Sequence, residues 1–321
     1  METELIEHIS AKLREIVPDI KISAVRSFVG ENFWSFEIAN KFNRGSGAAL
    51  NAALALQKAT SEFIERDAFR IHTNILNAKT SNGFAAHTAL KDAHAAAKSE
   101  LIERDALLIC WFADIRPCWI SANSSAFSKK ILERLDYLER MGIQAKIGVI
   151  GKSSGDFVSV GMLNLDFFTN HDASWAFTTE AASSLHHALE KSALSLLRIA
   201  NLAITRSAQK IALFSEIHPK EISKPEHHLE YHLNPKNREL LIDWWMSSNT
   251  EVIDLGSETV ECIELKTDFA TGMNRYVSFA KSASHIPYFV GIPESSDLIC
   301  KRLSSLGIKQ RRNFEVIHPL P

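Results

Sequence analysis

The sequence predicts a mixed α/β (α+β) fold, in which a pseudo-symmetric pair of helices, each with an ExxER motif, packs on mixed sheets. Three observations support this prediction. Helical and strand-like patterns alternate along all 321 residues, as is typical of mixed folds. No Gly/Ser-rich or Pro-rich linker divides the chain, so we expect one compact domain over 1–321. A helical unit occurs twice within 45–105, which places both copies in one core.

The individual elements follow from local periodicity. Leu5, Ile9, Leu13 and Ile16 recur at helical spacing and predict a helix over 4–17. Similar or Ala-rich patterns predict helices at 47–73, 89–112, 128–141, 179–206, 237–248 and 295–306. Runs of β-branched and aromatic residues predict strands at 21–29, 33–39, 145–150, 157–165, 251–255, 259–266, 276–280 and 286–292. Three prolines make 215–236 the most loop-like stretch.

The composition excludes several functional classes. Lys and Arg number 36 against 38 Asp and Glu, whereas a nucleic-acid binder needs a basic excess. Four cysteines without a CxxC pair are too few for a disulfide scaffold. There is no signal-peptide pattern, and no apolar run approaches the roughly 18 residues of a spanning helix. We therefore expect a cytoplasmic protein that binds neither nucleic acid nor membrane.

The internal repeat is the strongest signal in the sequence. SEFIERDA at 61–68 and SELIERDA at 99–106 differ only by Phe63 against Leu101. Each copy follows an Ala-rich run that itself follows a glycine turn. Within each copy two glutamates lie three residues apart and therefore share a helix face. These glutamates are Glu62 and Glu65 in the first copy and Glu100 and Glu103 in the second.

The glutamate pairs allow two interpretations. On solvated helices they would form i,i+4 ion pairs with Arg66 and Arg104, worth about 0.2–0.5 kcal/mol each. Two copies in matching contexts, with small residues on the same faces, favour converging carboxylates instead. Such carboxylates repel one another unless a hard divalent cation is bound, and Mg²⁺ usually shares its shell with nucleotide phosphates. A di-iron bundle would carry ExxH, which is absent.

Residues 45–105 resemble the YcaO family of ATP-dependent enzymes that modify peptide backbones. The resemblance rests on G-x-G…A…SEFIER and on SNGFAAHTALKDAHAAAKSELIERD at 81–105, which is similar to the family pattern SNG-x-A…A…E-x-x-ERD. It is diffuse elsewhere, although 182–198 is similar to a later family helix. The resemblance implies that 1–321 form a single YcaO-like catalytic domain with ATP and Mg²⁺ as cofactors.

The resemblance also implies roles for individual residues. The four glutamates match the family's metal ligands. Arg104 matches an arginine that contacts nucleotide phosphate, and Arg66 is its counterpart in the first copy. The SNG segment and the residues after it supply polar ATP contacts in the family, here Asn82, Thr88 and Asp92. Ala85 stands where the family can have Ser and offers no hydrogen-bonding group.

The end of the chain adds a further expectation. Azoline-forming family members often end in P-x-P-x-P, and the tail at 313–321 ends Ile317-His318-Pro319-Leu320-Pro321, which keeps the last two prolines. The resemblance therefore implies that Pro319 and Pro321 are catalytic, with the Pro321 carboxylate orienting or deprotonating the nucleophile. The alternative is a frayed, Pro-rich terminus.

The implied activity is ATP-dependent cyclodehydration of Cys, Ser or Thr in a ribosomally made precursor peptide. The product is a thiazoline or oxazoline, formed by phosphorylation of the backbone amide oxygen, in the biosynthesis of peptide antibiotics and bacteriocins. The implied partners are the precursor peptide, a separate leader-binding protein similar to ubiquitin-activating enzymes, and an optional flavin-dependent azoline dehydrogenase. A thioamide-forming enzyme and a non-catalytic scaffold subunit remain alternatives, although four intact glutamates argue against the scaffold.

One histidine motif stands outside this interpretation. His228 and His232 in EHHLEYH have the i,i+4 spacing of metal ligands on a helix. Neither HExxH nor a neighbouring cysteine accompanies them. We therefore expect a loop or helix cap here rather than a zinc site.

Overall fold

The computed structural model describes residues 2–25, 27, 29, 33–121, 125–166, 168, 175–209, 216–237 and 239–319. The chain divides into two compact units, Met1–Leu101 with Thr259–Ser282 (unit 1) and Ile102–Glu258 with Ala283–Pro321 (unit 2). Helix α3 (Leu90–Phe112) begins in unit 1 and ends in unit 2. The predicted mixture of helices and sheets is confirmed, while the single domain over 1–321 stays a prediction.

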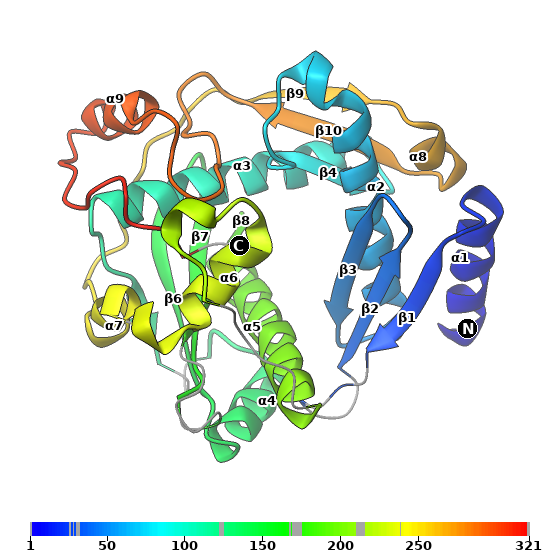
Figure 1. Cartoon of the computed structure of the whole chain (residues 1–321), viewed down its shortest axis with the longest axis horizontal. Helices are drawn as coiled ribbons and strands as arrows, with labels where there is room; N and C mark the ends of the chain where they lie inside the picture. Colours follow the sequence, from blue (N-terminus) through cyan, green and yellow to red (C-terminus); the bar gives the residue numbers. More distant parts are fainter. Residues whose placement is uncertain are drawn as a thin grey trace. The chain divides into compact units, whose positions relative to one another are not determined.

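Unit 1 contains two antiparallel three-stranded sheets, ordered β1-β2-β3 and β4-β10-β9 (Figure 1). Its elements, besides the start of α3, are α1 (Glu2–Ile16), β1 (Lys21–Val25), β2 (Trp34–Ala39), β3 (Arg44–Ala49), α2 (Ala52–Leu76), β4 (Phe84–His87), β9 (Glu261–Leu265), α8 (Asp268–Gly272) and β10 (Tyr276–Lys281). A short strand therefore precedes each of the two long helices, β3 before α2 and β4 before α3.

Strand β3 and helix α2 approach each other unusually closely. Ala55 and Ala59 are fully buried on the helix face that packs against β3. A Cβ atom at Gly47 would collide with the backbone of both alanines, and one at Gly45 would collide with the backbone of Ala59 and Phe63. The absence of side chains at these two glycines is therefore what brings β3 against the glutamate-bearing helix.

Unit 2 is built on an antiparallel sheet with the order β5-β6-β7-β8, and α5 packs on β7 and β8 (Figure 1). Its elements, besides the end of α3, are β5 (Cys118–Ile120), α4 (Lys129–Arg140), β6 (Gln144–Ser153), β7 (Asp156–Asn164), β8 (Trp175–Ala182), α5 (Leu185–Ala208), the 3₁₀ turn η1 (Pro219–Glu221), α6 (Pro225–Leu233), the 3₁₀ turn η2 (Pro235–Asn237), α7 (Glu239–Met246) and α9 (Asp297–Ser305).

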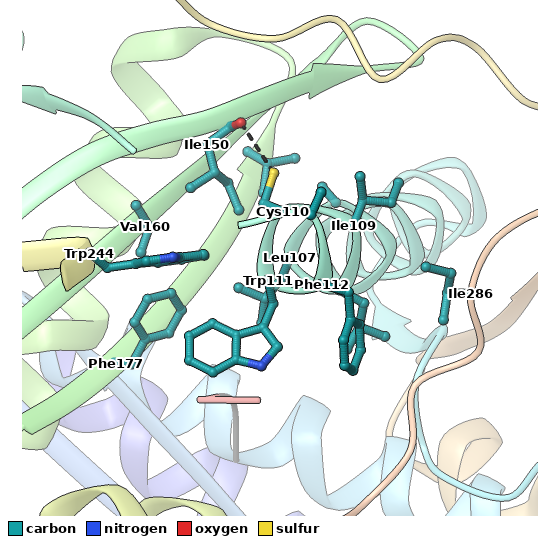
Figure 2. Packing of buried hydrophobic residues seen from close by; sticks show 14 of the residues in the cluster. Leu107, Ile109, Cys110, Trp111, Phe112, Ile150, Val160, Phe177, Trp244 and Ile286 are labelled. Carbon is teal, nitrogen blue, oxygen red and sulfur yellow. Dashed lines mark hydrogen bonds between the residues drawn. The ribbon is translucent and has the colours of Figure 1, made fainter. Parts of the chain in front are cut away.

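The apolar end of α3 forms the centre of the core of unit 2 (Figure 2). Trp111 packs edge-on against Trp244, with ring centroids 5.3 Å apart. The buried Cys110 thiol donates to the Ile150 carbonyl over 3.4 Å, and all four cysteines are free. Among the helices that the structure describes, none combines the length and apolar character that crossing a bilayer requires.

The sequence missed four strands and misplaced two helix starts. α2 begins at Ala52 and α5 at Leu185, because Asn51 and Ser184 accept hydrogen bonds from the first helical turns as N-caps. The Ala-rich residues before these caps form β3 and β8 instead of helix. The other two missed strands, β4 and β5, are only four and three residues long.

Two predicted strands are absent from the described residues. Residues 251–255 contribute only a single bridge between Asp254 and Lys152, and the apolar run 286–292 is irregular. The predicted loop 215–236 instead contains α6. In 286–292, side chains rather than a neighbouring strand satisfy the N–H groups of Ile286 and Gly291.

A buried ion pair holds α3 to α9. Arg302 and Asp105 are 2% and 1% exposed. The Nη2 and Nε atoms of Arg302 donate to one Asp105 oxygen over 3.0 and 3.1 Å, and the Ile286 N–H donates to the other over 2.7 Å. Nη1 of Arg302 also donates to Glu258 over 2.6 Å. Removing one partner would leave the other charge buried without its counter-ion.

We expect Arg302→Met to lower the free energy of unfolding of unit 2 by about 3–5 kcal/mol, the usual cost of breaking a buried ion pair. Urea unfolding followed by tryptophan fluorescence measures this loss. Arg311→Met removes the same charge from an exposed position and should change stability by no more than about 0.5 kcal/mol. Equal effects of the two substitutions would contradict the prediction.

Candidate functional site

The first glutamate of helix α2 is held by strand β3. One Glu62 oxygen accepts hydrogen bonds from the backbone N–H of Ser46 over 2.7 Å and from its hydroxyl over 3.0 Å. The other oxygen accepts from Arg66 over 2.7 Å, so the i,i+4 ion pair expected for a solvated helix does form here. Arg66 is 44% exposed and available on its outer side.

The second glutamate, Glu65, lies in a less favourable environment for a charge. One of its oxygens accepts from the Ala86 N–H of β4 over 2.8 Å. Burial raises the pKa of Glu65 from 4.5 to about 8; the Ala86 bond lowers it, and the negative charges of Glu100 and Glu62 raise it further. Three of the four predicted metal ligands therefore interact electrostatically within unit 1.

A divalent cation fits this arrangement. Carboxylate oxygens are the ligands that Mg²⁺ prefers, and a bound cation would offset both the burial and the repulsion from Glu100 and Glu62 that raise the pKa of Glu65. Over the ranges that the structure describes, no group of three or more His, Cys, Asp or Glu side chains is arranged to hold a metal ion alone. Mg²⁺ does not require such a group, since it keeps several waters and takes phosphate oxygens from a nucleotide.

In unit 2 the fourth glutamate, Glu103, is 7% exposed and is held by strand β8. The Thr179 hydroxyl donates to it over 2.6 Å. Burial raises the pKa of Glu103 to about 7; Arg104 lowers it and Glu180 raises it. Glu100 and Glu103 share a face of the continuous helix α3 by their spacing of three residues.

Arg104 differs from its counterpart in the first copy of the repeat. Its guanidinium lies over the ring of Tyr288, 5.2 Å from the centroid, and its Nε is 3.9 Å from Glu103. The Arg104 side chain is 20% exposed, against 44% for Arg66. A partly desolvated guanidinium is well suited to phosphate, because its charge is less screened there than at the surface.

The predicted polar contacts to ATP lie around strand β4 in unit 1. The Asn82 side-chain oxygen is buried without a hydrogen-bond partner among the described residues. Thr88 and Asp92 both lie beside His87: the Thr88 hydroxyl is 3.3 Å and an Asp92 oxygen 3.5 Å from its Nδ1. Asn82, Thr88 and Asp92 precede Glu100 by 18, 12 and 8 positions along the chain.

The C-terminal segment is packed rather than frayed as far as Pro319. Ile317 and His318 are 1% and 0% exposed, and Pro319 is buried. Pro321 lies outside the described residues. The carboxylate role assigned to Pro321 therefore remains a prediction.

The family model described as YcaO cyclodehydratase, ATP- and Mg²⁺-binding, matches residues 72–290. The chain belongs to the YcaO family. It is an ATP-dependent cyclodehydratase with ATP and Mg²⁺ as its cofactors. The matched range contains Glu100, Glu103 and Arg104, whereas Glu62 and Glu65 precede it.

Solved structures share the YcaO fold at low sequence identity. A YcaO protein from Methanopyrus kandleri bound with AMPPCP and Mg²⁺ is 14% identical, with a TM-score of 0.62 over 92% of this chain and 95% of that chain. A chain of the E. coli microcin synthetase McbBCD complex is 12% identical, with a TM-score of 0.60 over 94% of this chain and 96% of that chain. A heterocyclase in complex with substrate and cofactor is 9% identical, with a TM-score of 0.68. The match covers 97% of this YcaO chain but only 55% of the heterocyclase chain. The search of curated proteins found no match.

Sequence reasoning missed the residues that hold the predicted ligands. Ser46 lies in a Gly/Ala-rich run that resembles a helix start, and Thr179 lies in a segment predicted as helix. Glu180 was also missed: Ser195 donates to it over 2.5 Å and Lys191 over 3.0 Å. Burial opposes its ionisation, but these two partners hold the pKa of Glu180 below its ordinary value.

We expect Thr179→Val to weaken the binding of Mg²⁺-AMPPCP about 10- to 100-fold, because Glu103 loses the hydroxyl that orients it. Thr179→Ser should retain binding. Thr178→Val is the matched control, since the Thr178 hydroxyl is buried without a partner among the described residues. Isothermal titration calorimetry measures the affinities, and wild-type affinity in Thr179→Val would contradict the prediction.

Glu65 should make the metal-free protein less stable as the pH rises. The pKa of Glu65 is about 8 in the folded protein and about 4.5 in the unfolded chain. Between pH 4.5 and 8 the folded protein therefore binds a proton that the unfolded chain does not, and the stability gained from this proton is lost as the pH rises through that range. Relative to Glu65→Gln, the wild type should lose roughly 2–4 kcal/mol of unfolding free energy between pH 5 and 8. Urea unfolding in EDTA measures this difference.

The control for this prediction is Glu139→Gln, which removes a carboxylate from an exposed position on α4. Its stability should follow that of the wild type in parallel over the same pH range. A constant difference between wild type and Glu65→Gln would show that Glu65 is ionised throughout.

Proposed function

We propose that this YcaO enzyme converts Cys, Ser or Thr in a ribosomally made precursor peptide to thiazoline or oxazoline, in the biosynthesis of a peptide natural product with antibiotic or bacteriocin activity. The observation that carries the proposal is the desolvation of two glutamates, the half-buried Glu65 in unit 1 and the buried Glu103 in unit 2. Their hydrogen-bond donors are a neutral N–H and a neutral O–H. Their charge is thus suited to a cation that arrives with the nucleotide.

The proposed reaction activates an amide. The thiol or hydroxyl of the peptide loses its proton and adds to the preceding backbone carbonyl carbon, and the γ-phosphoryl group of ATP is transferred to the resulting oxygen. The C–O bond then breaks and its oxygen leaves as part of phosphate, the amide N–H loses its proton, and a C=N bond forms. One water is lost from the peptide, and ATP becomes ADP and phosphate. Catalysis of this kind depends on positioning and charge neutralisation.

Each group of site residues has a role in the proposed reaction that suits its chemistry. Glu62, Glu65, Glu100 and Glu103 would hold Mg²⁺, which when bound neutralises phosphate charge. Arg104, and Arg66 in the first copy, would contact phosphates. Asn82, Thr88 and Asp92 would orient the nucleotide with their polar groups. Pro319 and Pro321 would place the end of the chain at the reacting peptide.

Partner proteins complete the proposal. We expect the enzyme to act in the cytoplasm with a separate leader-binding protein similar to ubiquitin-activating enzymes, optionally joined by a flavin-dependent azoline dehydrogenase. The similar fold of a microcin synthetase subunit, solved as a complex and also with pro-MccB17 bound, supports an assembly of this kind. Co-expression followed by gel filtration tests for it.

The catalytic prediction concerns Glu100→Gln and Glu103→Gln. Each should lower ADP release and loss of water from the peptide at least 100-fold, because an amide is a poor Mg²⁺ ligand. The assay uses synthetic Cys-, Ser- and Thr-containing peptides with Mg²⁺-ATP and mass spectrometry, with Glu139→Gln as the control. EDTA should abolish the reaction.

Each alternative function has its own outcome in this assay. Replacement of an amide oxygen by sulfur, seen only when sulfide is added, would identify a thioamide-forming enzyme. The absence of thermal stabilisation by Mg²⁺-AMPPCP would identify a scaffold subunit. Wild-type activity in both glutamine variants would exclude the proposed metal site.

A further inference from the structure

Two histidines of helix α6 hold the C-terminal segment by its backbone. His228 and His232 lie four residues apart and so share a helix face. Both rings contact the backbone oxygen of His318, from Nδ1 of His228 at 2.9 Å and from Nε2 of His232 at 3.1 Å. The side chains of all three histidines are at most 1% exposed. His228 and His232 are therefore neither in a loop nor caps of the helix, whereas the neighbouring His227 accepts from the Ser223 N–H before the helix start over 3.3 Å. Among the described residues these histidines form no group arranged to hold a metal ion.

The partners of these rings define their protonation. The Gly291 N–H donates to Nε2 of His228 over 2.8 Å, so the proton of His228 is on Nδ1 and points to the His318 oxygen. His232 faces a carbonyl, which only accepts, and therefore donates from Nε2. The positive φ of Gly291 (78°) and its close approach to the Ile222 backbone oxygen explain why glycine presents this N–H.

The His318 ring is fixed as well. It stacks on the His228 ring with centroids 4.3 Å apart, and its Nε2 donates to the Phe289 carbonyl over 2.9 Å. Burial lowers the pKa of His228 to about 4 and that of His232 to about 3, so both stay neutral around pH 7. The arrangement is thus a permanent hold on the segment rather than a switch at physiological pH.

Within unit 2 the contacts of His228 and His232 with the His318 oxygen lie near Arg104. Tyr288 connects the two: its ring is 5.4 Å from the His318 ring and 5.2 Å from the Arg104 guanidinium. The Arg104 charge contributes to the lowered pKa values of His228 and His318, as expected for a neighbouring cation. Pro319 follows His318 directly and is buried.

We propose that His228 and His232 are positioning residues for cyclodehydration, because their grip on the His318 carbonyl fixes Pro319 in place relative to Arg104. The inference rests on the proposed function, since it takes the tail as part of the reaction site. A displacement of about 1 Å can reduce a rate 100-fold even when substrate binding is unchanged. Replacing these histidines is therefore expected to lower kcat and to leave nucleotide binding unchanged.

The test compares His232→Leu, which removes the donor, with His232→Gln, whose amide keeps an N–H near the position of Nε2. His232→Leu should lower kcat for peptide dehydration at least tenfold, with KM for ATP within twofold of the wild type, and His232→Gln should restore most of the rate. Hydrogen exchange of residues 313–319 should accelerate at least tenfold in His232→Leu only. His227→Leu, on the same helix, is the matched control.

Each result of this test decides the proposal. Faster exchange with an unchanged kcat, or a lower kcat with unchanged exchange, would overturn it. If His232→Leu does not fold, His228→Gln takes its place: its amide oxygen can accept from the Gly291 N–H near the position of Nε2, but no donor remains near Nδ1 for the His318 oxygen. The same changes in kcat and exchange are then expected. A wild type that dehydrates no peptide refutes the proposed function, whereas an active wild type with equally active variants refutes only the positioning role.

Discussion

Helices α2 and α3 hold acidic side chains away from water, and the rest of the structure is organised around satisfying them. A carboxylate removed from water is costly unless hydrogen bonds or counter-charges compensate it. Each carboxylate accepts a hydrogen bond from a different element: Glu62 from β3, Glu65 from β4, Glu103 from β8 and Asp105 from the segment before α9. The two strands that precede the helices thus act as supports for the first copy of the repeat, and distant parts of the chain support the second.

The two copies of the repeat have diverged in how far their charges are compensated. In the first copy Arg66 pairs with Glu62, and Asp67 accepts from Asn43 and Arg70 at the surface. In the second copy the equivalent aspartate, Asp105, is buried against Arg302, and Arg104 lies over Tyr288. The same residue types therefore serve mainly local helix stability in one copy and long-range contacts in the other. This difference favours Arg104 over Arg66 as the more desolvated site for an anion.

Much of the helical content and the position of the acidic motifs could be predicted from the sequence, because both depend on local spacing. The residues that complete the site could not. Ser46 and Thr179 lie in small-residue stretches without strand-like alternation, and their value depends on neighbours 16 and 76 positions away. The irregular path of 286–292 was equally hidden, since Asp105 and His228 replace a strand partner there. Patterns report periodicity, whereas these contacts depend on tertiary structure.

The close seating of α2 on β3 has a consequence for interpreting mutagenesis. Alanine is the usual neutral probe, but at Gly45 or Gly47 it is an insertion of volume between two backbones. Such a change would push the strand away and take with it the Ser46 groups that hold Glu62. An alanine scan across this strand would therefore report loss of activity at positions where no side chain had been removed. Functional assignments in this part of the chain therefore need probes that shorten side chains rather than add them.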